Sequence, residues 1–189
     1  MKYLVGIDAG SSSCKACVFD TEGNCVGKAV REYHNYYPQP GMVEEDGEEM
    51  VLEIIQACKT AVEKANASGE DVLAVAFSTQ GGPLALMDSE EKLMGNFISW
   101  QDLRGFMVAE ELMGTMDPHR YYEISGLACS PSNPFTKLLW MRKFDPNFQS
   151  AVRYVTFQEY FLKRFGADEY VMDEMSCERI GLGSPENHD

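Results

Sequence analysis

The first twenty residues constrain the fold of this chain more than any other stretch. An apolar run, Tyr3–Ile7, leads into Asp8 and a turn of small residues, and a second apolar run ends at Phe19. Two short runs joined by glycine and serine are typical of a β-hairpin, and the small residues let the turn backbone approach a ligand closely. The sequence therefore predicts an antiparallel hairpin with a carboxylate at the end of its first strand.

The hairpin turn has two interpretations from its residues. Backbone amides, three serine hydroxyls and the amine of Lys15 suit a phosphate chain, with Asp8 beside a hydrated Mg²⁺. The alternative is an ordinary hairpin whose acid bonds turn amides. A P-loop and a dinucleotide fingerprint do not fit, because no Gly-Lys-Ser/Thr follows and the segment after the turn is predicted as a strand. These residues alone favour neither interpretation.

Composition narrows the classes of partner. The 189-residue chain has a net charge of −14, whereas a nucleic-acid partner requires concentrated Lys and Arg. Its apolar runs are shorter than the roughly 20 residues of a membrane span, and the N-terminal run is too short for a signal peptide. Six scattered cysteines show no disulfide framework. We therefore expect a cytoplasmic protein with reduced thiols and with neither a nucleic-acid nor a membrane partner.

Strands and helices alternate after the hairpin. By periodicity we predict a strand over residues 25–33, a helix over 44–66, a buried strand over 72–78, strands over 83–87 and 96–100, helices over 103–116 and 135–143, a strand over 152–156 and a helix over 157–165. The predicted apolar face of the first helix consists of Met50, Ile54, Ile55, Cys58 and Val62. No clear pattern follows residue 165. Three strands followed by this alternation indicate the α/β class.

Four further segments carry motifs. They are GMVEEDGEEM over residues 41–50, FSTQGG and LALMD over 77–88, ISWQDLR over 98–104, and SGL, SP and TKLLW over 125–140. With the hairpin, in this order and at this spacing, they resemble the FGGY family of carbohydrate kinases over most of positions 4–140. The resemblance implies a ribonuclease H-like domain of the actin-like ATPase superfamily, an α/β fold in which helices flank a mixed central sheet.

The resemblance also implies an activity and a cofactor site. It implies ATP-dependent phosphorylation of a sugar or polyol hydroxyl, with Asp8 at the metal and the γ-phosphate. Lys15 stands where the family commonly has Arg. The lysine keeps the positive charge but lacks the planar guanidinium that binds with two parallel hydrogen bonds. The residues implied to line the phosphate loop are Gly10, Ser11, Ser12 and Ser13.

The implied sugar pocket departs from the better-known family members. Its residues would be Gln80, Gly81, Gly82, Asp102 and Ser132. Glycerol kinases carry Arg-Glu at positions 81 and 82 and xylulose kinases carry Met-His, so two glycines point to neither substrate. The two glycines could also form only a tight turn, and Asp102 could pair with Arg104 at a helix start.

Three other groups have structural interpretations. We expect Trp100 and Trp140 to lie in the core, Glu44 and Glu45 to form a solvated helix start, and Tyr33 to pack locally.

The family's catalytic base, an Asp in a later segment, and its C-terminal lobe lie beyond the region covered here. We therefore expect residues 1–189 to be an N-terminal kinase domain cut before its end and inactive alone. A homodimer is compatible with the sequence. The alternative class is a non-catalytic, regulatory protein that binds a sugar or a nucleotide.

Overall fold

The computed structural model describes residues 1–181, which form two compact units. Unit 1 consists of Met1–Asn35 and Asp46–Gln80, and unit 2 of Tyr36–Glu45 and the chain from Gly81 onward. The chain therefore passes from one unit to the other three times. In the part that the structure describes, no helix is both long enough and apolar enough to cross a membrane.

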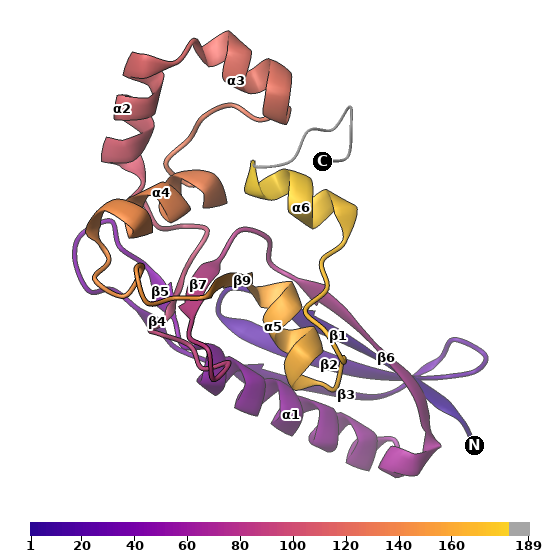
Figure 1. Ribbon diagram of the computed structural model, residues 1–189. Coiled ribbons are helices and arrows are strands. Elements are labelled where there is room, and N and C mark those ends of the chain that lie inside the picture. Colours follow the sequence, from indigo (N-terminus) through magenta and orange to yellow (C-terminus); the bar gives the residue numbers. More distant parts are fainter. Residues whose placement is uncertain (182–189) are drawn as a thin grey trace. The chain divides into compact units, whose positions relative to one another are not determined.

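Unit 1 is built on a mixed four-stranded sheet (Figure 1). Its strands are β1 (Tyr3–Ala9), β2 (Ser13–Asp20), β3 (Cys25–Glu32) and β6 (Val72–Thr79), in the order β3-β2-β1-β6. The first three pair antiparallel, and β6 runs parallel to β1. The predicted hairpin and third strand are confirmed. A short 3-10 helix, Gly69–Asp71, precedes β6.

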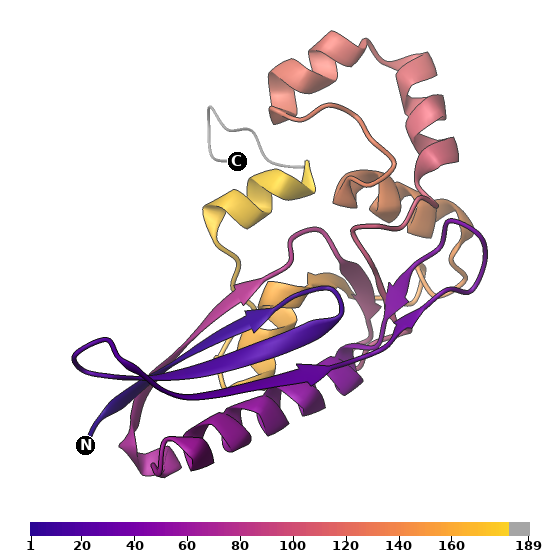
Figure 2. The same ribbon diagram turned by 180° about the vertical axis from the view of Figure 1, so that it is seen from behind.

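Helix α1 (Gly47–Lys64) packs against β3 and β2, and Figure 2 shows it from behind. The Asp46 side chain caps its first turn by accepting from two backbone amides. Its buried positions are Gly47, Met50, Val51, Ile54, Ala57 and Ala61. The contact face is thus rotated from the predicted one, because alanines rather than larger residues face the sheet. Small side chains let the helix backbone come close to Gly27 of β3.

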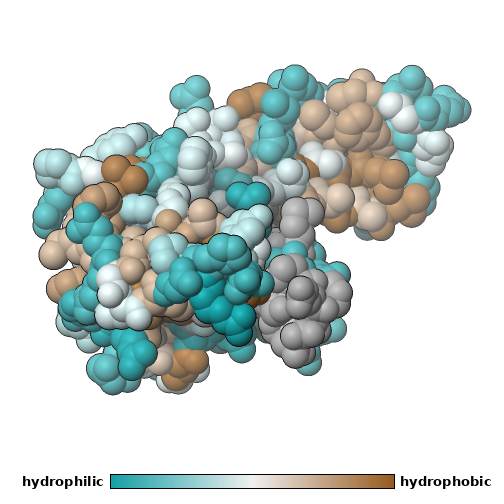
Figure 3. All heavy atoms as spheres, turned by 90° about the horizontal axis from the view of Figure 1, so that it is seen from above, coloured by the Kyte–Doolittle hydropathy of each residue, from teal (hydrophilic) through white to brown (hydrophobic). Residues whose placement is uncertain are grey.

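Strand β6 is present as predicted, but the prediction that it is buried is wrong. Leu73 is 60% exposed and Val75 is 45% exposed. The strand lies at the edge of the sheet, whereas α1 covers β3 and β2. In the view of Figure 3, hydrophobic side chains remain at the surface among hydrophilic ones.

Unit 2 contains a second sheet, which includes the strands predicted over 83–87, 96–100 and 152–156 in shorter form; the sequence did not indicate that they form a sheet of their own. Its order is β4-β5-β8-β7-β9, with β4 at Asn35–Tyr36, β5 at Glu44–Glu45, β8 at Phe97–Ile98, β7 at Leu84–Met87 and β9 at Arg153–Thr156. Strand β7 is fully buried. Its residues Leu84 and Leu86 pack with Ile98 and Met141 into a hydrophobic cluster.

Five helices complete unit 2: α2 (Phe106–Thr115), α3 (Pro118–Ser125), α4 (Pro134–Phe144), α5 (Phe157–Arg164) and α6 (Glu174–Ile180). Helices α2, α4 and α5 confirm predictions, with shorter or shifted ends. Helix α3 was missed although Asp117 caps it and Pro118 opens it, a common helix start. Helix α6 lies in the stretch without a clear pattern, and Asp173 caps it.

The six cysteines are all free thiols, as expected. Burial raises the pKa of Cys14 and of Cys58 to about 11.

Candidate functional site

In unit 1, the hairpin places Asp8 and Lys15 opposite each other. The two residues are direct partners in the β1–β2 register, so their side chains project from the same face of the sheet. Ser78 of β6 is the neighbour of Asp8 on its other side. Asp8 is exposed, whereas the adjacent Ile7 and Ala9 are buried on the other face. A carboxylate, an amine and a hydroxyl therefore share the polar end of one face.

The hairpin turn is held by its own backbone and by Tyr33. The Gly10 amide donates to the Ser13 carbonyl at 3.0 Å, and the Tyr33 amide donates to the Ser12 carbonyl at 3.2 Å. The Tyr33 hydroxyl contacts the carbonyl oxygens of Gly10 and Ser13, at 3.0 Å from the latter. Carbonyl oxygens of the turn, which would repel a phosphate, therefore accept hydrogen bonds from other groups of unit 1.

Tyr33 thus does more than the expected local packing, because it fixes the turn that carries the serines. The sequence contained one signal of this role, a phenol at the end of the strand that pairs with β2.

Gln80 braces the same turn from the end of β6. Its side-chain oxygen accepts from the Ser11 hydroxyl at 2.9 Å, and its side-chain nitrogen donates to the Gly10 carbonyl at 3.3 Å. Its backbone amide donates to the Ala9 carbonyl at 3.1 Å. The structure therefore brings Gln80 together with the predicted phosphate-loop residues, all within unit 1.

In unit 2, Gly81 and Gly82 lie where three other segments meet. Gly82 has φ +105°, and a Cβ there would lie 3.3 Å from the Trp100 Cβ and 3.7 Å from the Pro134 Cγ. A Cβ on Gly81 would lie 3.2 Å from the Arg179 Nε. The positive φ of Gly82 fits the tight-turn interpretation, and the bare backbone beside Trp100 and the Arg179 side chain fits the pocket interpretation. Arg179 was not found from the sequence, because it lies in the stretch without a clear pattern.

Trp100 corrects one expectation, since it is 44% exposed rather than part of the core. Trp140 is partly buried against the hydrophobic cluster of unit 2. The exposed indole beside Gly82 leaves an aromatic surface of the kind that packs against the C–H groups of a sugar.

Ser132 belongs to a loop that leads into α4. Its hydroxyl is 2.9 Å from the Ser130 hydroxyl. The buried Thr136 hydroxyl lies 2.9 Å from the Ser130 carbonyl and 2.8 Å from the Asn133 carbonyl. These bonds hold the loop and thereby the start of α4, where Pro134 lies near Gly82.

Asp102 is buried and fully engaged by neighbours. Its carboxylate accepts from the Val43 amide at 2.7 Å and from the Arg104 guanidinium at 2.9 Å. Arg104 also donates to Glu44 at 2.8 Å. Burial opposes the charge of Arg104, but the bonds to Asp102 and Glu44 outweigh burial and raise its pKa. The pairing interpretation therefore describes Asp102 here, and its carboxylate is not open to a substrate in this arrangement.

A second buried polar group lies beside the first. Glu45 is fully buried and accepts from the Ser99 hydroxyl at 2.7 Å, while the Lys137 amine donates to the Ser99 carbonyl. The interpretation of Glu44 and Glu45 as a solvated helix start is therefore wrong, because these residues form β5 and pair inside unit 2. Burial lowers the pKa of Lys137 to about 8, against the opposing effect of the nearby Asp102 and Glu45. Together these contacts tie the Trp100 segment to α4.

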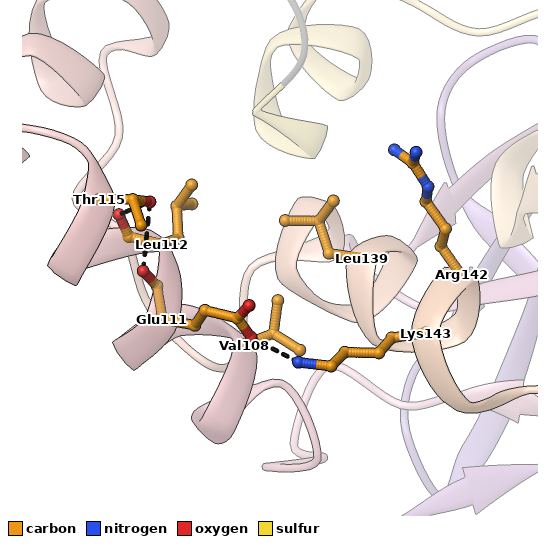
Figure 4. Close-up of a pocket in the computed structure, with 7 residues that line it drawn as sticks. All are labelled: Val108, Glu111, Leu112, Thr115, Leu139, Arg142 and Lys143. Atoms are coloured by element: carbon orange, nitrogen blue, oxygen red, sulfur yellow. Dashed lines mark hydrogen bonds and ion pairs between the residues drawn. The ribbon is translucent and has the colours of Figure 1, made fainter.

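A hollow of about 390 Å³ opens between α2 and α4 (Figure 4). It is lined by Val108, Glu111, Leu112, Thr115, Leu139, Arg142 and Lys143. An ion pair of 2.6 Å joins Glu111 to Lys143 across it. The predicted site residues are not part of this lining.

A magnesium ion would have few protein ligands here. Among residues 1–181, no cluster of three or more His, Cys, Asp or Glu side chains could hold a metal. Mg²⁺ commonly uses one or two carboxylates with water and substrate phosphates, so the lone exposed Asp8 fits that mode.

Comparison with known proteins gives a family match. The sequence model described as "FGGY family of carbohydrate kinases, N-terminal domain" matches residues 3–181. A glycerol kinase from Malacoplasma penetrans is 32% identical over 146 residues, which are 77% of this chain and 29% of the relative. A gluconokinase from Bacillus licheniformis is 27% identical over 181 residues, which are 95% of this chain and 35% of the relative.

Solved structures show the same fold. A ligand-bound xylulose kinase from Lactobacillus acidophilus aligns with a TM-score of 0.92 at 22% identity, covering 100% of this chain and 38% of that one. A gluconate kinase from the same organism gives a TM-score of 0.92 at 22% identity, covering 99% of this chain and 37% of that one. The chain thus spans about a third of the length of these relatives.

Proposed function

Because the chain belongs to the FGGY family of carbohydrate kinases, we propose that it supplies the phosphate-binding and sugar-binding lobe of an ATP-dependent carbohydrate kinase. The fold is the ribonuclease H-like α/β fold that its sequence implied. The observation that carries the proposal is the pair of Asp8 and Lys15 on one face, beside a turn that Tyr33 and Gln80 brace.

In this proposal, each residue of the turn has a role toward a nucleotide. Asp8 holds a hydrated Mg²⁺, and the Lys15 amine and the hydroxyls of Ser12 and Ser13 bind phosphate oxygens, close to the backbone of Gly10 and Ser11, whose own hydroxyl donates to Gln80. The metal, when bound, supplies neutralisation of the charge that develops on the transferred phosphoryl group. Tyr33 and Gln80 keep the turn in the geometry that these contacts need.

The acceptor in this proposal is a sugar or polyol hydroxyl. Gly81, Gly82, Ser132 and the exposed face of Trp100 would contact it. Asp102 would act indirectly, because its hydrogen bonds hold the segment that carries Trp100. The relatives are named for glycerol, xylulose and gluconate, so the shared chemistry is phosphorylation of a small polyhydroxy compound.

The rest of the catalytic machinery is expected outside this chain. We propose that residues 1–189 form one N-terminal kinase domain and that a C-terminal lobe brings the catalytic base. A cytoplasmic location and a homodimer stay predictions.

The test is substitution of Asp8 in the complete gene product that contains this chain. Asp8→Asn removes the charge that the metal requires, so we expect the rate of ADP formation with Mg²⁺-ATP and the best acceptor to fall by at least about 100-fold. The acceptor panel is glycerol, xylulose and gluconate. The matched control is Asp168→Asn, an exposed acid whose side chain should not affect the rate.

Full activity of Asp8→Asn would contradict the role of this residue. If the unaltered protein binds a sugar or a nucleotide but phosphorylates no acceptor, the regulatory-protein alternative replaces the kinase.

A further inference from the structure

The Arg179 side chain lies directly over Gly81. A Cβ built on Gly81 would be 3.2 Å from the Arg179 Nε, 3.6 Å from its Cζ and 3.8 Å from its Cδ. The Cδ, Nε and Cζ atoms of Arg179 therefore lie close to where a side chain of residue 81 would begin. Both residues belong to unit 2, although almost a hundred positions separate them in sequence.

Glycine at position 81 makes this arrangement fit. A contact of 3.2 Å is tighter than nine in ten ordinary Cβ contacts, so a side chain at 81 would make the Arg179 side chain shift by a few tenths of an ångström. The next residue, Gly82, is close to Trp100 and Pro134 in the same way. The two glycines thus form a patch of bare backbone bordered by the Cα and Cβ of Trp100, the ring of Pro134 and the side chain of Arg179.

The charge of Arg179 is not neutralised inside the described chain. Within residues 1–181, no acidic side chain lies within salt-bridge distance of Arg179, although the chain has 30 acidic residues against 16 basic ones. The residue is exposed, near the end of α6. A planar guanidinium in this condition is suited to a carboxylate, which it binds with two parallel hydrogen bonds.

We propose that Arg179 is a substrate-binding residue and that the acceptor is an aldonate, a sugar acid whose carboxylate pairs with this guanidinium. The inference rests on the proposed function, since it assigns the substrate class of the same site. The aldonate carboxylate pairs with the Arg179 guanidinium beside Gly81, and its carbon chain extends toward Gly82 and Trp100. Glycine at position 81 lets the guanidinium lie close to the backbone, whereas a side chain there would make it shift by a few tenths of an ångström.

The experiment compares D-gluconate with D-sorbitol in the complete gene product. These ligands share a six-carbon polyhydroxy chain and differ in a carboxylate against a CH₂OH group. Binding is measured by titration calorimetry, and kcat/KM by ADP formation. We expect gluconate to be preferred, and Arg179→Ala to weaken its binding by about 10- to 100-fold while sorbitol is unaffected, the effect of losing a charge-assisted pair.

Two further variants test the geometry. Arg179→Lys keeps the charge without the planar fork, so its loss should be intermediate. Gly81→Ala should shift the guanidinium by a few tenths of an ångström and lower the preference for gluconate less than Arg179→Ala does. The matched control is Arg120→Ala, which removes an exposed arginine of α3 and should change neither ligand. Added salt should weaken gluconate binding and leave sorbitol binding unchanged.

Four results would overturn the inference. The first is equal use of gluconate and sorbitol, and the second is gluconate binding that survives Arg179→Ala. The third is a loss of ATP affinity in Arg179→Ala without loss of gluconate affinity, which would place Arg179 at the nucleotide instead. In these cases phosphorylation of a neutral acceptor would leave the proposed kinase function standing. The fourth is a protein that phosphorylates neither ligand nor any other polyol, which would overturn the proposed function as well.

Discussion

Lys137 is an amine that the fold buries completely. It is fully buried in unit 2, where its amine donates to the Ser99 carbonyl and lies near Asp102 and Glu45. The acids favour its charge, and burial disfavours it more strongly, so its pKa falls to about 8 from the ordinary 10.5. Its protonation should therefore be linked to folding.

The linkage has a definite sign and pH range. Between pH 8 and 10.5 the folded protein has released the Lys137 proton while the unfolded chain retains it, so the free energy of unfolding rises with pH. Relative to Lys137→Met, the unaltered protein should gain stability across this range, by up to about 1.4 kcal/mol per pH unit. Urea unfolding at several pH values measures the difference, with Lys59→Met as an exposed control. A difference that is constant between pH 8 and 10.5 would contradict the assignment.

Single residues also mark the limit of prediction from sequence. The Asp8–Lys15 pair could be predicted because neighbouring strands of a hairpin bring their residues together by local geometry. The contacts of Tyr33, Gln80 and Arg179 could not, because they depend on which distant segments the tertiary fold brings together.

Among the elements, α1 and β3 make the closest approach in unit 1. A Cβ on Gly27 would lie 2.2 Å from the Ala61 carbonyl oxygen and 3.0 Å from the Ala65 Cβ. This distance leaves no room for a methyl group between the strand and the helix backbone. The alanines of α1 and the glycine of β3 therefore form one matched contact.

Gly27→Ala should separate the helix from the sheet. We expect the free energy of unfolding to fall by about 1–3 kcal/mol, the usual cost of overpacking a close contact. Denaturant unfolding followed by circular dichroism measures the loss. Gly69→Ala is the matched control, because a Cβ there meets nothing within 4 Å. Equal stability of the two variants would show that α1 shifts without cost.

At this scale, periodicity predicted where most elements lie but not how they are covered. The face of α1 that contacts the sheet differs from the predicted face, because small residues make part of this contact and a hydrophobic pattern gives small residues little weight. The apolar sequence of β6 indicated burial, yet the strand stands at an edge. The two-residue strand β5 is too short to give any periodic signal.

For the whole molecule, the chain divides into two units with separate sets of candidate residues. The residues predicted to bind phosphate belong to unit 1. The residues proposed to contact the acceptor belong to unit 2: Gly81, Gly82, Ser132 and Arg179. The atoms nearest a Cβ built on either glycine belong to Arg179, Trp100 and Pro134, and none of these side chains is an acid that could serve as a base for the sugar hydroxyl. Phosphoryl transfer requires such positioning in addition to charge neutralisation.

Residues 1–189 alone should therefore show no ATP-dependent phosphorylation. The measurement is ADP formation by the purified chain with Mg²⁺-ATP and each of glycerol, xylulose and gluconate. The complete gene product serves as the positive control. Turnover by the isolated chain with any of these acceptors would mean that it already contains a base.

The three crossings between the units have a consequence for cutting the gene. A fragment ending at Gln80 would hold both pieces of unit 1 but would also carry residues 36–45, whose strand β5 pairs with β8. The complementary fragment from Gly81 would lose Glu44 and Glu45, the partners of Arg104 and Ser99. Each half, expressed separately, would thus expose unpaired groups that the intact chain buries. No single cut in the gene therefore yields either unit intact, although each unit has its own core.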